Sequence, residues 1–259
     1  SDDTTMPAVF IGHGSPMNAL EHNRYTEAWH EFGRSIPVPR AILAISAHWY
    51  INATAVTAME RPRTIHDFYG FPQALFDVRY PAPGDPALAA EIAELVAPTW
   101  VGMDTDSWGL DHGTWSILVH MFPDADVPVV QLSIDAGKSG SYHVDLGAAL
   151  EPLRRQGVLV FASGNVVHNL RRIDWNRPDA AYDWAVDYDE AARDLMATDR
   201  GDIASLVDHP RHALASPTPD HLLPLFYLGG LAAAAGSTAD VLIGGYAMGS
   251  LSMTSYIVR

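Results

Sequence analysis

The sequence contains no cysteine among its 259 residues. Without thiols the chain forms no disulfide, carries no thiolate nucleophile, and holds no zinc ribbon or iron–sulfur cluster through cysteine. Any bound metal must therefore be coordinated by histidine, aspartate or glutamate. Histidine is plentiful, with 12 residues in the chain, so imidazole is the first ligand type to consider.

Positive charge is also scarce. Lys and Arg together number 16 against 31 Asp and Glu, which gives a formal net charge of -15. A surface this negative repels phosphate backbones, so we expect no nucleic-acid partner. No apolar run approaches the roughly 20 residues that cross a bilayer, so we expect no membrane association. Residues 1–5 are polar and acidic, unlike the basic start of a signal peptide, which predicts a cytoplasmic protein.

Several common enzyme motifs are missing too. The chain has no Gly-x-Ser-x-Gly elbow, no phosphate-binding loop and no dinucleotide-binding Gly-x-Gly-x-x-Gly fingerprint. What is present is typical of a compact globular protein, with 48% hydrophobic and 18% charged residues. No linker, repeat or low-complexity tract divides the chain. We therefore predict a flexible N-terminal segment over residues 1–6 and a single domain over residues 7–259.

One pattern recurs along the chain: a continuous apolar run ends in small residues and is followed by a histidine. The pattern occurs before His13, before His48 and, through a short loop, before His168. Apolar runs of this length are typical of buried strands. In open α/β sheets, ligands bind at the carboxyl ends of such strands. These three histidines are therefore candidate site residues.

Helical patterns separate the apolar runs. Residues 86–96 form one, with Asp85 as its N-cap. Residues 182–196 form another, whose acidic side chains we interpret as a solvated face rather than a site. The alternation predicts a single α/β domain with a central, mostly parallel or mixed sheet flanked by helices, and an active site at the carboxyl ends of the strands. Runs at 241–246 and 252–257 predict a closing antiparallel pair.

Two more histidines stand where helices are expected to begin. His112 follows Asp111, and His221 follows a proline-stiffened turn. Right-handed crossovers bring the carboxyl ends of the strands to one edge, so we expect the histidines to gather there. Three neutral imidazoles with open coordination positions suit a divalent ion that also binds substrate or O2. A further histidine left unligated would suit a proton-transfer step.

Seven short blocks of this sequence occur together and in order. They are GHGSP at 12–16, SAHW at 46–49, HDFYGFP at 66–72, YPAPG at 80–84, DHGTW at 111–115, GNVVHNL at 164–170 and TPDH at 218–221. In this combination the chain resembles the 4,5-DOPA extradiol dioxygenase branch of the class III ring-cleaving dioxygenases. The resemblance covers nearly the whole chain and implies an α/β fold with a mixed central sheet. It is specific to the family and much less so to a substrate.

The resemblance also implies roles for individual residues. It makes His13, His48 and His221 the metal ligands, a three-histidine set where distant relatives use a glutamate for the third. His168 matches the acid/base histidine of the family and becomes an extra ligand when zinc fills the site. His112 lines the substrate side. The pocket walls are assigned to His66, Tyr69 and Tyr246.

The implied reaction is ring opening of a DOPA-like catechol by O2 to a muconic semialdehyde, with Fe(II) as the active metal and Zn(II) as an alternative occupant. The expected partners are then a small aromatic catechol and O2, and a homo-oligomer is left open. A zinc-dependent hydrolase or amidase on the same scaffold is an alternative, because the same imidazoles can activate water. A binding protein without activity is a third possibility. His168 argues against it, because metal binding alone does not require this residue.

Overall fold

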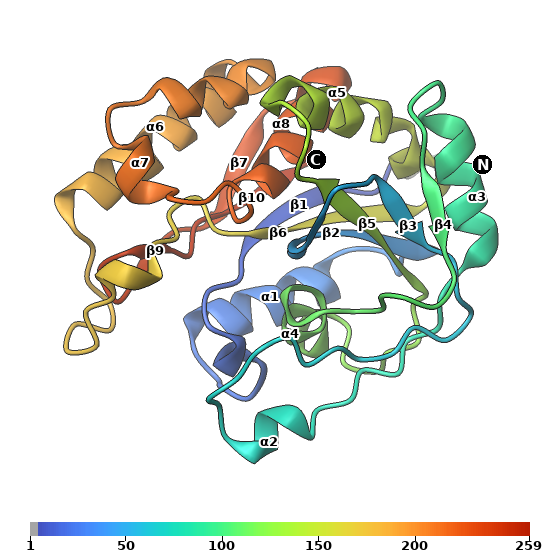
Figure 1. Cartoon of the computed structure of the whole chain (residues 1–259), viewed down its shortest axis with the longest axis horizontal. Coiled ribbons are helices and arrows are strands. Elements are labelled where there is room, and N and C mark those ends of the chain that lie inside the picture. The colour runs from blue at the N-terminus through green and yellow to red at the C-terminus, as the bar shows by residue number, and fades with distance from the viewer. Residues whose placement is uncertain (1–4) are drawn as a thin grey trace.

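A computed structural model describes residues 5–259. The molecule is built around one sheet of eight strands in the order β4-β3-β5-β2-β6-β1-β10-β7 (Figure 1). These strands are β1 (Ala8–Gly12), β2 (Ala41–Ile51), β3 (Ala55–Thr57), β4 (Gly102–Asp104), β5 (Val129–Asp135), β6 (Val158–Gly164), β7 (Ala239–Ile243) and β10 (Ser255–Val258). A separate two-stranded ladder pairs β8 (Tyr246–Ala247) with β9 (Leu251–Ser252).

The four central strands β5, β2, β6 and β1 run parallel to one another. Antiparallel strands extend the sheet on both sides, since β10 pairs antiparallel with β1 and β3 pairs antiparallel with β5. The predicted mixed α/β sheet is therefore confirmed, including the antiparallel closing pair of β7 and β10. All residues of β1, β5 and β6 are buried, which explains why these strands are continuous apolar runs.

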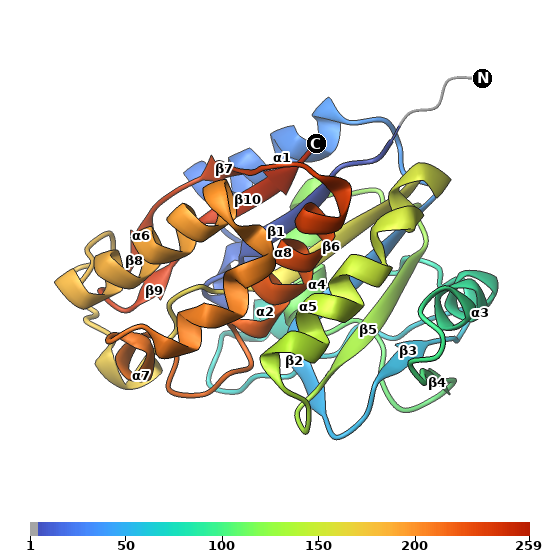
Figure 2. The same cartoon turned by 90° about the horizontal axis from the view of Figure 1, so that it is seen from above.

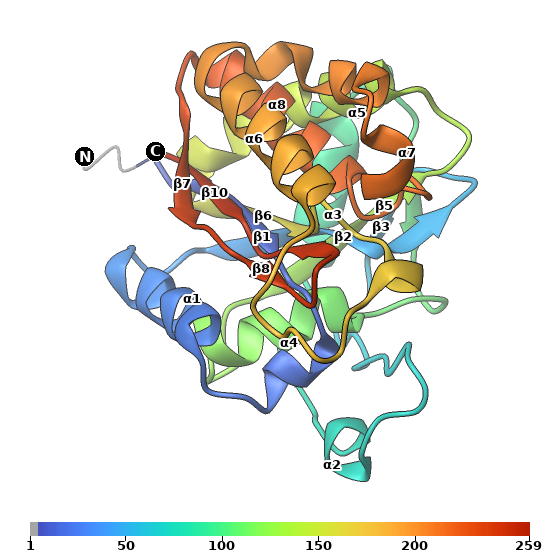
Figure 3. The same ribbon diagram turned by 90° about the vertical axis from the view of Figure 1, so that its left-hand side faces the viewer.

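Helices cover both faces of the sheet (Figures 1 and 3). The α-helices are α1 (Arg24–Ser35), α2 (Gln73–Phe76), α3 (Pro86–Leu95), α4 (His112–Met121), α5 (Gly140–Ala149), α6 (Asp183–Thr198), α7 (His212–Ala215) and α8 (Leu223–Ala235). Short 3-10 helices are η1 (Pro16–Ala19), η2 (Glu151–Gln156), η3 (Leu170–Arg172) and η4 (Arg200–Asp208). Seen from above, α5, α6 and α8 lie over one face (Figure 2), and α1 and α4 lie under the other (Figure 3).

The apolar core has two parts, one on each face of the sheet, because side chains along a strand point alternately to the two faces. In β2, Leu43 and Ile45 pack with the core under α5 and α8, whereas Ile42 and Ala44 pack with the core that includes side chains of α1 and α4. Successive side chains of a strand point to opposite faces, so one apolar run serves both layers. This arrangement fixes the strands, and with them the loops at their carboxyl ends.

Two local expectations can be compared with the structure. Asp85 is the N-cap of α3, and its Oδ1 accepts the Leu88 backbone N–H at 3.0 Å, as the sequence predicted.

The interpretation of the acidic helix α6 as a solvated face is wrong for Asp189. This carboxylate is fully buried and accepts hydroxyl groups of Ser252 at 2.6 Å and Thr254 at 2.8 Å. The hydrogen bonds compensate the cost of removing its charge from water.

The N-terminal segment predicted over residues 1–6 lies partly outside the described residues, because these begin at Thr5. Met6 is buried, and its backbone N–H donates to the Arg154 carbonyl at 2.9 Å, so it packs with the domain.

Of the helices in residues 5–259, none is both long and apolar enough to pass through a bilayer.

Candidate active site and metal centre

Five histidines from separate parts of the chain meet at the carboxyl-end edge of the central strands. His13 follows β1, His48 lies near the end of β2, and His168 comes four residues after β6. His112 is the first residue of α4, and His221 lies two residues before α8. The ring centroids of His48, His112 and His221 lie 5.1, 6.1 and 5.2 Å from that of His13. The sequence prediction that these residues gather at one edge is confirmed.

His13 and His48 face each other through their ligating atoms, with their Nε2 atoms 3.3 Å apart. The Ser163 hydroxyl donates to the Gly113 carbonyl at 2.5 Å. Its oxygen therefore accepts the Nδ1–H of His13, at 2.8 Å. This tautomer leaves the Nε2 lone pair of His13 pointing at His48. Two nitrogens held about 2.0–2.1 Å from a tetrahedral ion lie about 3.3 Å apart, so this separation suits two ligands of one metal.

His48 reaches this position through an irregularity in β2. The pairing of β2 with β5 shifts register between Ile45 and Tyr50, and its pairing with β6 ends at Ser46. The freed backbone N–H of His48 donates to the Ser46 hydroxyl at 3.2 Å. Bulges of this kind redirect side chains near active sites.

His221 is oriented by the residue before it. Its Nδ1 donates to the Asp220 carboxylate in a short hydrogen bond, which leaves Nε2 as the atom able to bind a metal. Carboxylate partners of this kind fix ring orientation and raise ligand basicity in metal sites. The His221 ring centroid lies 4.9 Å from that of His48. On its other side His221 stacks on His168, with centroids 3.5 Å apart and ring planes 5° from parallel.

His112 is tied to the aromatic loop at residues 64–72. Its backbone N–H donates to Asp67 Oδ1 at 2.9 Å, and its Nδ1 lies 2.8 Å from the same oxygen, although the ring N–H does not align for a hydrogen bond. Asp67 also lies 3.7 Å from Nδ1 of His48. Burial raises the pKa of Asp67, but its contacts with the two histidines outweigh this and hold the pKa below its usual value.

A second buried carboxylate fixes the start of α4. Asp111 accepts the Ser46 hydroxyl at 2.6 Å and the Trp108 indole N–H at 3.2 Å, together with the Gln131 side-chain amide. Burial raises the pKa of this carboxyl to about 6. The network joins β2, β5 and α4 beneath the histidines. It therefore fixes the positions of His48 and His112 relative to each other.

The residues present suit a divalent metal. Burial first, and then repulsion from neighbouring imidazoles, lower the pKa of His48 to about 3 and hold the pKa values of His13 and His221 well below the usual value. Burial likewise lowers the pKa of His168 to about 4. Metal ligands must be unprotonated, and these imidazoles are neutral at pH 7. One ligand atom each from His13, His48 and His112 lie within 4.8 Å of one another, a group able to hold a metal ion.

His221 lies beside this group of three histidines but is not one of them. The assignment of His221, and not His112, as the third ligand therefore stays a prediction.

The assignment of His66, Tyr69 and Tyr246 to the pocket walls also stays a prediction. His66 contacts the Val78 carbonyl through Nε2 at 2.8 Å, Tyr69 is 92% exposed, and the Tyr246 hydroxyl donates to Asp189 at 3.1 Å.

Sequence reasoning gave no individual role to four residues that shape the centre. They are Asp67, Phe68, Ser163 and Asp220. Phe68 comes closest to a pocket wall, because its ring centroid lies 5.5 Å from that of His112. Asp67 and Asp220 each had a signal, since each is adjacent to a histidine in a recognised block. Ser163 had none, because a serine at the end of a buried strand usually only satisfies the backbone.

Comparison with known proteins decides the family. Residues 7–256 match the family described as the catalytic LigB subunit of aromatic ring-opening dioxygenase. The chain belongs to the LigB family. A 4,5-DOPA dioxygenase extradiol of Escherichia coli K12 is 48% identical over 256 residues, which cover 97% of this chain and 94% of that protein. One from Beta vulgaris is 35% identical, covering 99% of this chain and 97% of that protein.

A solved structure agrees with this membership. The crystal structure of an uncharacterized protein from Escherichia coli K12 superimposes with a TM-score of 0.85 and 43% identity, covering 98% of this chain and 100% of the other. As a LigB-family member the chain is an enzyme of the extradiol dioxygenase class. The neutral histidines described above, buried or half-buried, are consistent with a metal-dependent enzyme of this kind.

We predict that the metal-free LigB-family protein loses stability as the pH falls below 6.5. The unfolded chain protonates its histidines near pH 6.5, while His13, His48, His168 and His221 stay neutral in the folded state. Below pH 6.5 the unfolded state therefore binds more protons than the folded state. Each such histidine then lowers the unfolding free energy by about 1.4 kcal/mol for each pH unit. The raised pKa of Asp111 acts in the opposite direction, but it is a single group, and the lowered pKa values of His120, His143 and His212 add to the fall.

The measurement is urea unfolding in a chelator between pH 5 and pH 8. The unfolding free energy should be flat above pH 7 and fall below pH 6.5. A His48→Gln variant should give a shallower fall, because one titrating group is gone. An unfolding free energy that stays constant down to pH 5 would contradict the neutral, buried state of these histidines.

We also predict that Gly113→Ala weakens metal binding. A Cβ at this position would lie 2.4 Å from the Ser46 hydroxyl and 3.0 Å from Cδ2 of His48. Ser46 must therefore shift, and this disturbs His48, whose backbone N–H donates to that hydroxyl. Loss of ligand orientation typically costs about 10- to 100-fold in metal affinity. Gly201→Ala is the matched control, since its Cβ would meet nothing nearer than 3.6 Å. Competition with a chromophoric chelator measures both variants, and equal affinities would contradict the prediction.

Proposed function

We propose that this enzyme opens the ring of a DOPA-like catechol with O2, next to the diol, to give a muconic semialdehyde. The observation that carries the proposal is the convergence of five histidines, two of which face each other through Nε2 atoms 3.3 Å apart. Four of the five are neutral because of burial. The names of the Escherichia coli and Beta vulgaris relatives support a DOPA-like substrate.

The proposed metal ligands are His13, His48 and His221, each through Nε2. The partners of Nδ1 support this set for two of them, since Ser163 accepts from His13 and Asp220 accepts from His221. When bound there, Fe(II) would lower the pKa of a coordinated catechol and provide a path for electrons from the ring to O2. Three imidazoles also suit Zn(II), which has no redox chemistry.

His168 is proposed as the group that moves protons. It stacks on His221, so it lies beside the proposed ligands. Burial lowers its pKa to about 4, which leaves a ring nitrogen free to accept the second hydroxyl proton of the catechol. A general base works best when its pKa lies near the operating pH, so this low pKa makes His168 a weak base by itself. A metal-bound catechol would be more acidic, which would offset the weakness. When zinc fills the site, the same imidazole is proposed as an extra ligand.

His112 is proposed on the substrate side of the centre. Asp67 anchors its backbone N–H and lies beside its ring, and Phe68 packs edge-on against it. The loop at residues 64–72 thus contributes an aromatic wall next to a histidine able to hydrogen-bond a catechol oxygen. Phenyl rings in this tilted geometry also pack well against a flat substrate.

The direct test is anaerobic reconstitution with Fe(II), followed by admission of O2 with DOPA and a small panel of other catechols. We expect one O2 consumed per ring opened and the appearance of a yellow semialdehyde. Zn(II)-loaded enzyme is the control and should consume none. If no catechol supports O2 uptake while iron stays bound, the proposed reaction is wrong.

For the ligand set, we predict that His221→Ala abolishes stoichiometric metal binding, because the ion loses one of three imidazoles. Metal content after dialysis, measured by plasma emission spectroscopy, tests this. His30→Ala changes an exposed histidine of α1 and should retain the metal. Full metal content in His221→Ala, with loss in His112→Ala, would assign the third ligand to His112 instead.

For proton transfer, we predict that His168→Ala keeps its iron but opens the catechol ring at least about 100-fold more slowly, the usual contribution of general acid–base catalysis. Iron content and the rate of O2 consumption are measured on the same preparation. Wild-type turnover in this variant would remove the acid/base role, whereas loss of iron would show that His168 is a required ligand.

A further inference from the structure

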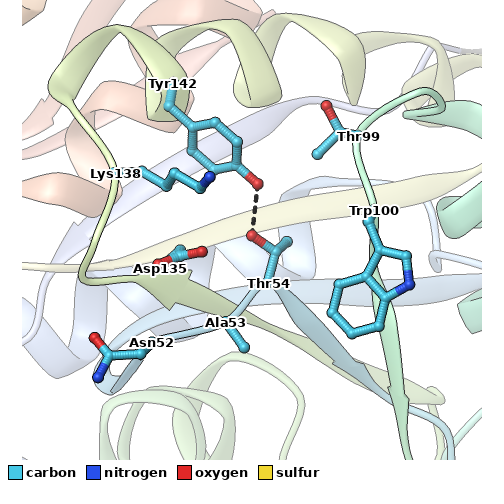
Figure 4. A pocket seen from close by; sticks show the side chains of 8 residues that line it. All are labelled: Asn52, Ala53, Thr54, Thr99, Trp100, Asp135, Lys138 and Tyr142. Atoms are coloured by element: carbon cyan, nitrogen blue, oxygen red, sulfur yellow. Dashed lines mark hydrogen bonds between the residues drawn. The ribbon is translucent and has the colours of Figure 1, made fainter.

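A cavity of about 310 Å³ lies beyond the ends of β2 and β5, at the same edge of the sheet as the histidines (Figure 4). Its volume falls at the lower end of small-molecule sites, which span about 300–1,000 Å³. The residues that carry the argument are Thr54 between β2 and β3, Trp100 before β4, Asp135 at the end of β5, Lys138 between β5 and α5, and Tyr142 in the first turn of α5. No histidine of the metal centre lines it.

One wall of the cavity carries the only lysine of the chain, since every other basic residue is an arginine. The Lys138 ammonium lies 5.4 Å from the centroid of the Tyr142 ring. No ion pair formed within residues 5–259 includes it. A lysine ammonium offers three hydrogen-bond donors on a compact charge. The cavity therefore presents a cation able to take a carboxylate.

The same wall carries an opposite charge. Asp135 is largely buried, and its Oδ1 accepts the Gly137 backbone N–H at 2.9 Å. Its side chain takes part in no ion pair within the described part of the chain. The second carboxylate oxygen is thus available to an ammonium group. Because Asp135 and Lys138 do not pair with each other, they offer two separate charged contacts.

The rest of the cavity is a polar floor and a flat apolar wall. The hydroxyl groups of Thr54 and Tyr142 are 2.6 Å apart, which fixes the Tyr142 ring. Figure 4 shows this pair between Lys138 and Asp135 on one side and the Trp100 indole on the other. Trp100 is 72% exposed, so a large indole face remains without a partner. Such a face is suited to stack a planar group.

We propose that this cavity binds a free α-amino acid with a flat side chain. Lys138 takes its carboxylate, Asp135 takes its ammonium, and the side chain packs on Trp100. An anion or a cation of the same shape satisfies only one of the two charges, so the zwitterion is the preferred form. The site is separate from the catalytic centre and does not depend on the proposed reaction.

The single lysine allows a direct measurement. Reductive methylation with ¹³C-formaldehyde keeps the charge of Lys138 and labels only this side chain and the terminal amine. Lys138→Arg identifies the Lys138 resonance by its loss. Titration with L-phenylalanine should shift this resonance saturably. 3-Phenylpropanoate, which lacks the ammonium, and 2-phenylethylamine, which lacks the carboxylate, should bind at least tenfold more weakly.

Variants at the other contacts complete the test. Asp135→Asn should weaken the binding of L-phenylalanine at least tenfold, whereas 3-phenylpropanoate should bind no more weakly, because a neighbouring negative charge is removed. Trp100→Ala should weaken the binding of L-phenylalanine. Trp175→Ala is the control, because it changes a tryptophan that is 77% exposed but lies outside the cavity, and it should leave binding unchanged. The proposal is overturned if L-phenylalanine does not shift the Lys138 resonance, or if 3-phenylpropanoate binds as tightly as L-phenylalanine. It is also overturned if Asp135→Asn and Trp100→Ala both bind L-phenylalanine as tightly as the methylated wild-type protein.

Discussion

The Ser163 hydroxyl lies where three parts of the enzyme meet. It belongs to the second-last residue of strand β6, donates to the carbonyl of Gly113 in α4, and accepts the Nδ1–H of His13 after β1. Because a carbonyl can only accept, the direction of both hydrogen bonds is fixed, and with it the tautomer of His13. Which nitrogen of His13 can bind a metal thus depends on a buried serine of the neighbouring strand. The rest of the centre is assembled around this fixed imidazole.

Burial gives the histidine cluster its chemical character. In water these imidazoles would be partly protonated near pH 6.5 and would repel each other and a cation. Inside the domain, burial holds the pKa of His48 at about 3 and that of His168 at about 4. The carboxylates nearby, Asp67 and Asp220, are each placed against a histidine. A metal bound among these histidines would therefore meet neutral imidazoles, and its charge would be balanced by anions in contact with two of the rings.

The carboxyl-end edge of the sheet carries both the histidine centre and the charged cavity. The histidine centre lies where β1, β2 and β6 end, on segments that are joined to one another by buried hydrogen bonds. The cavity beside Lys138 lies beyond β2 and β5 and combines opposite charges with an exposed indole. Both follow from one topological fact: parallel strands release their loops at the same edge, where side chains of distant sequence can converge.

The sequence by itself determined the fold class, the family and the histidines that gather at the site, because continuous apolar runs and histidine-bearing blocks are local patterns. Only the tertiary structure decided what contacts those histidines. Ser163 and Asp67 act on residues far away in the sequence. Asp189 looked solvated on an acidic helix until the hydroxyls of Ser252 and Thr254 were placed around it. Hydrogen-bond partners and burial depend on how segments pack, and a local pattern carries no information about this.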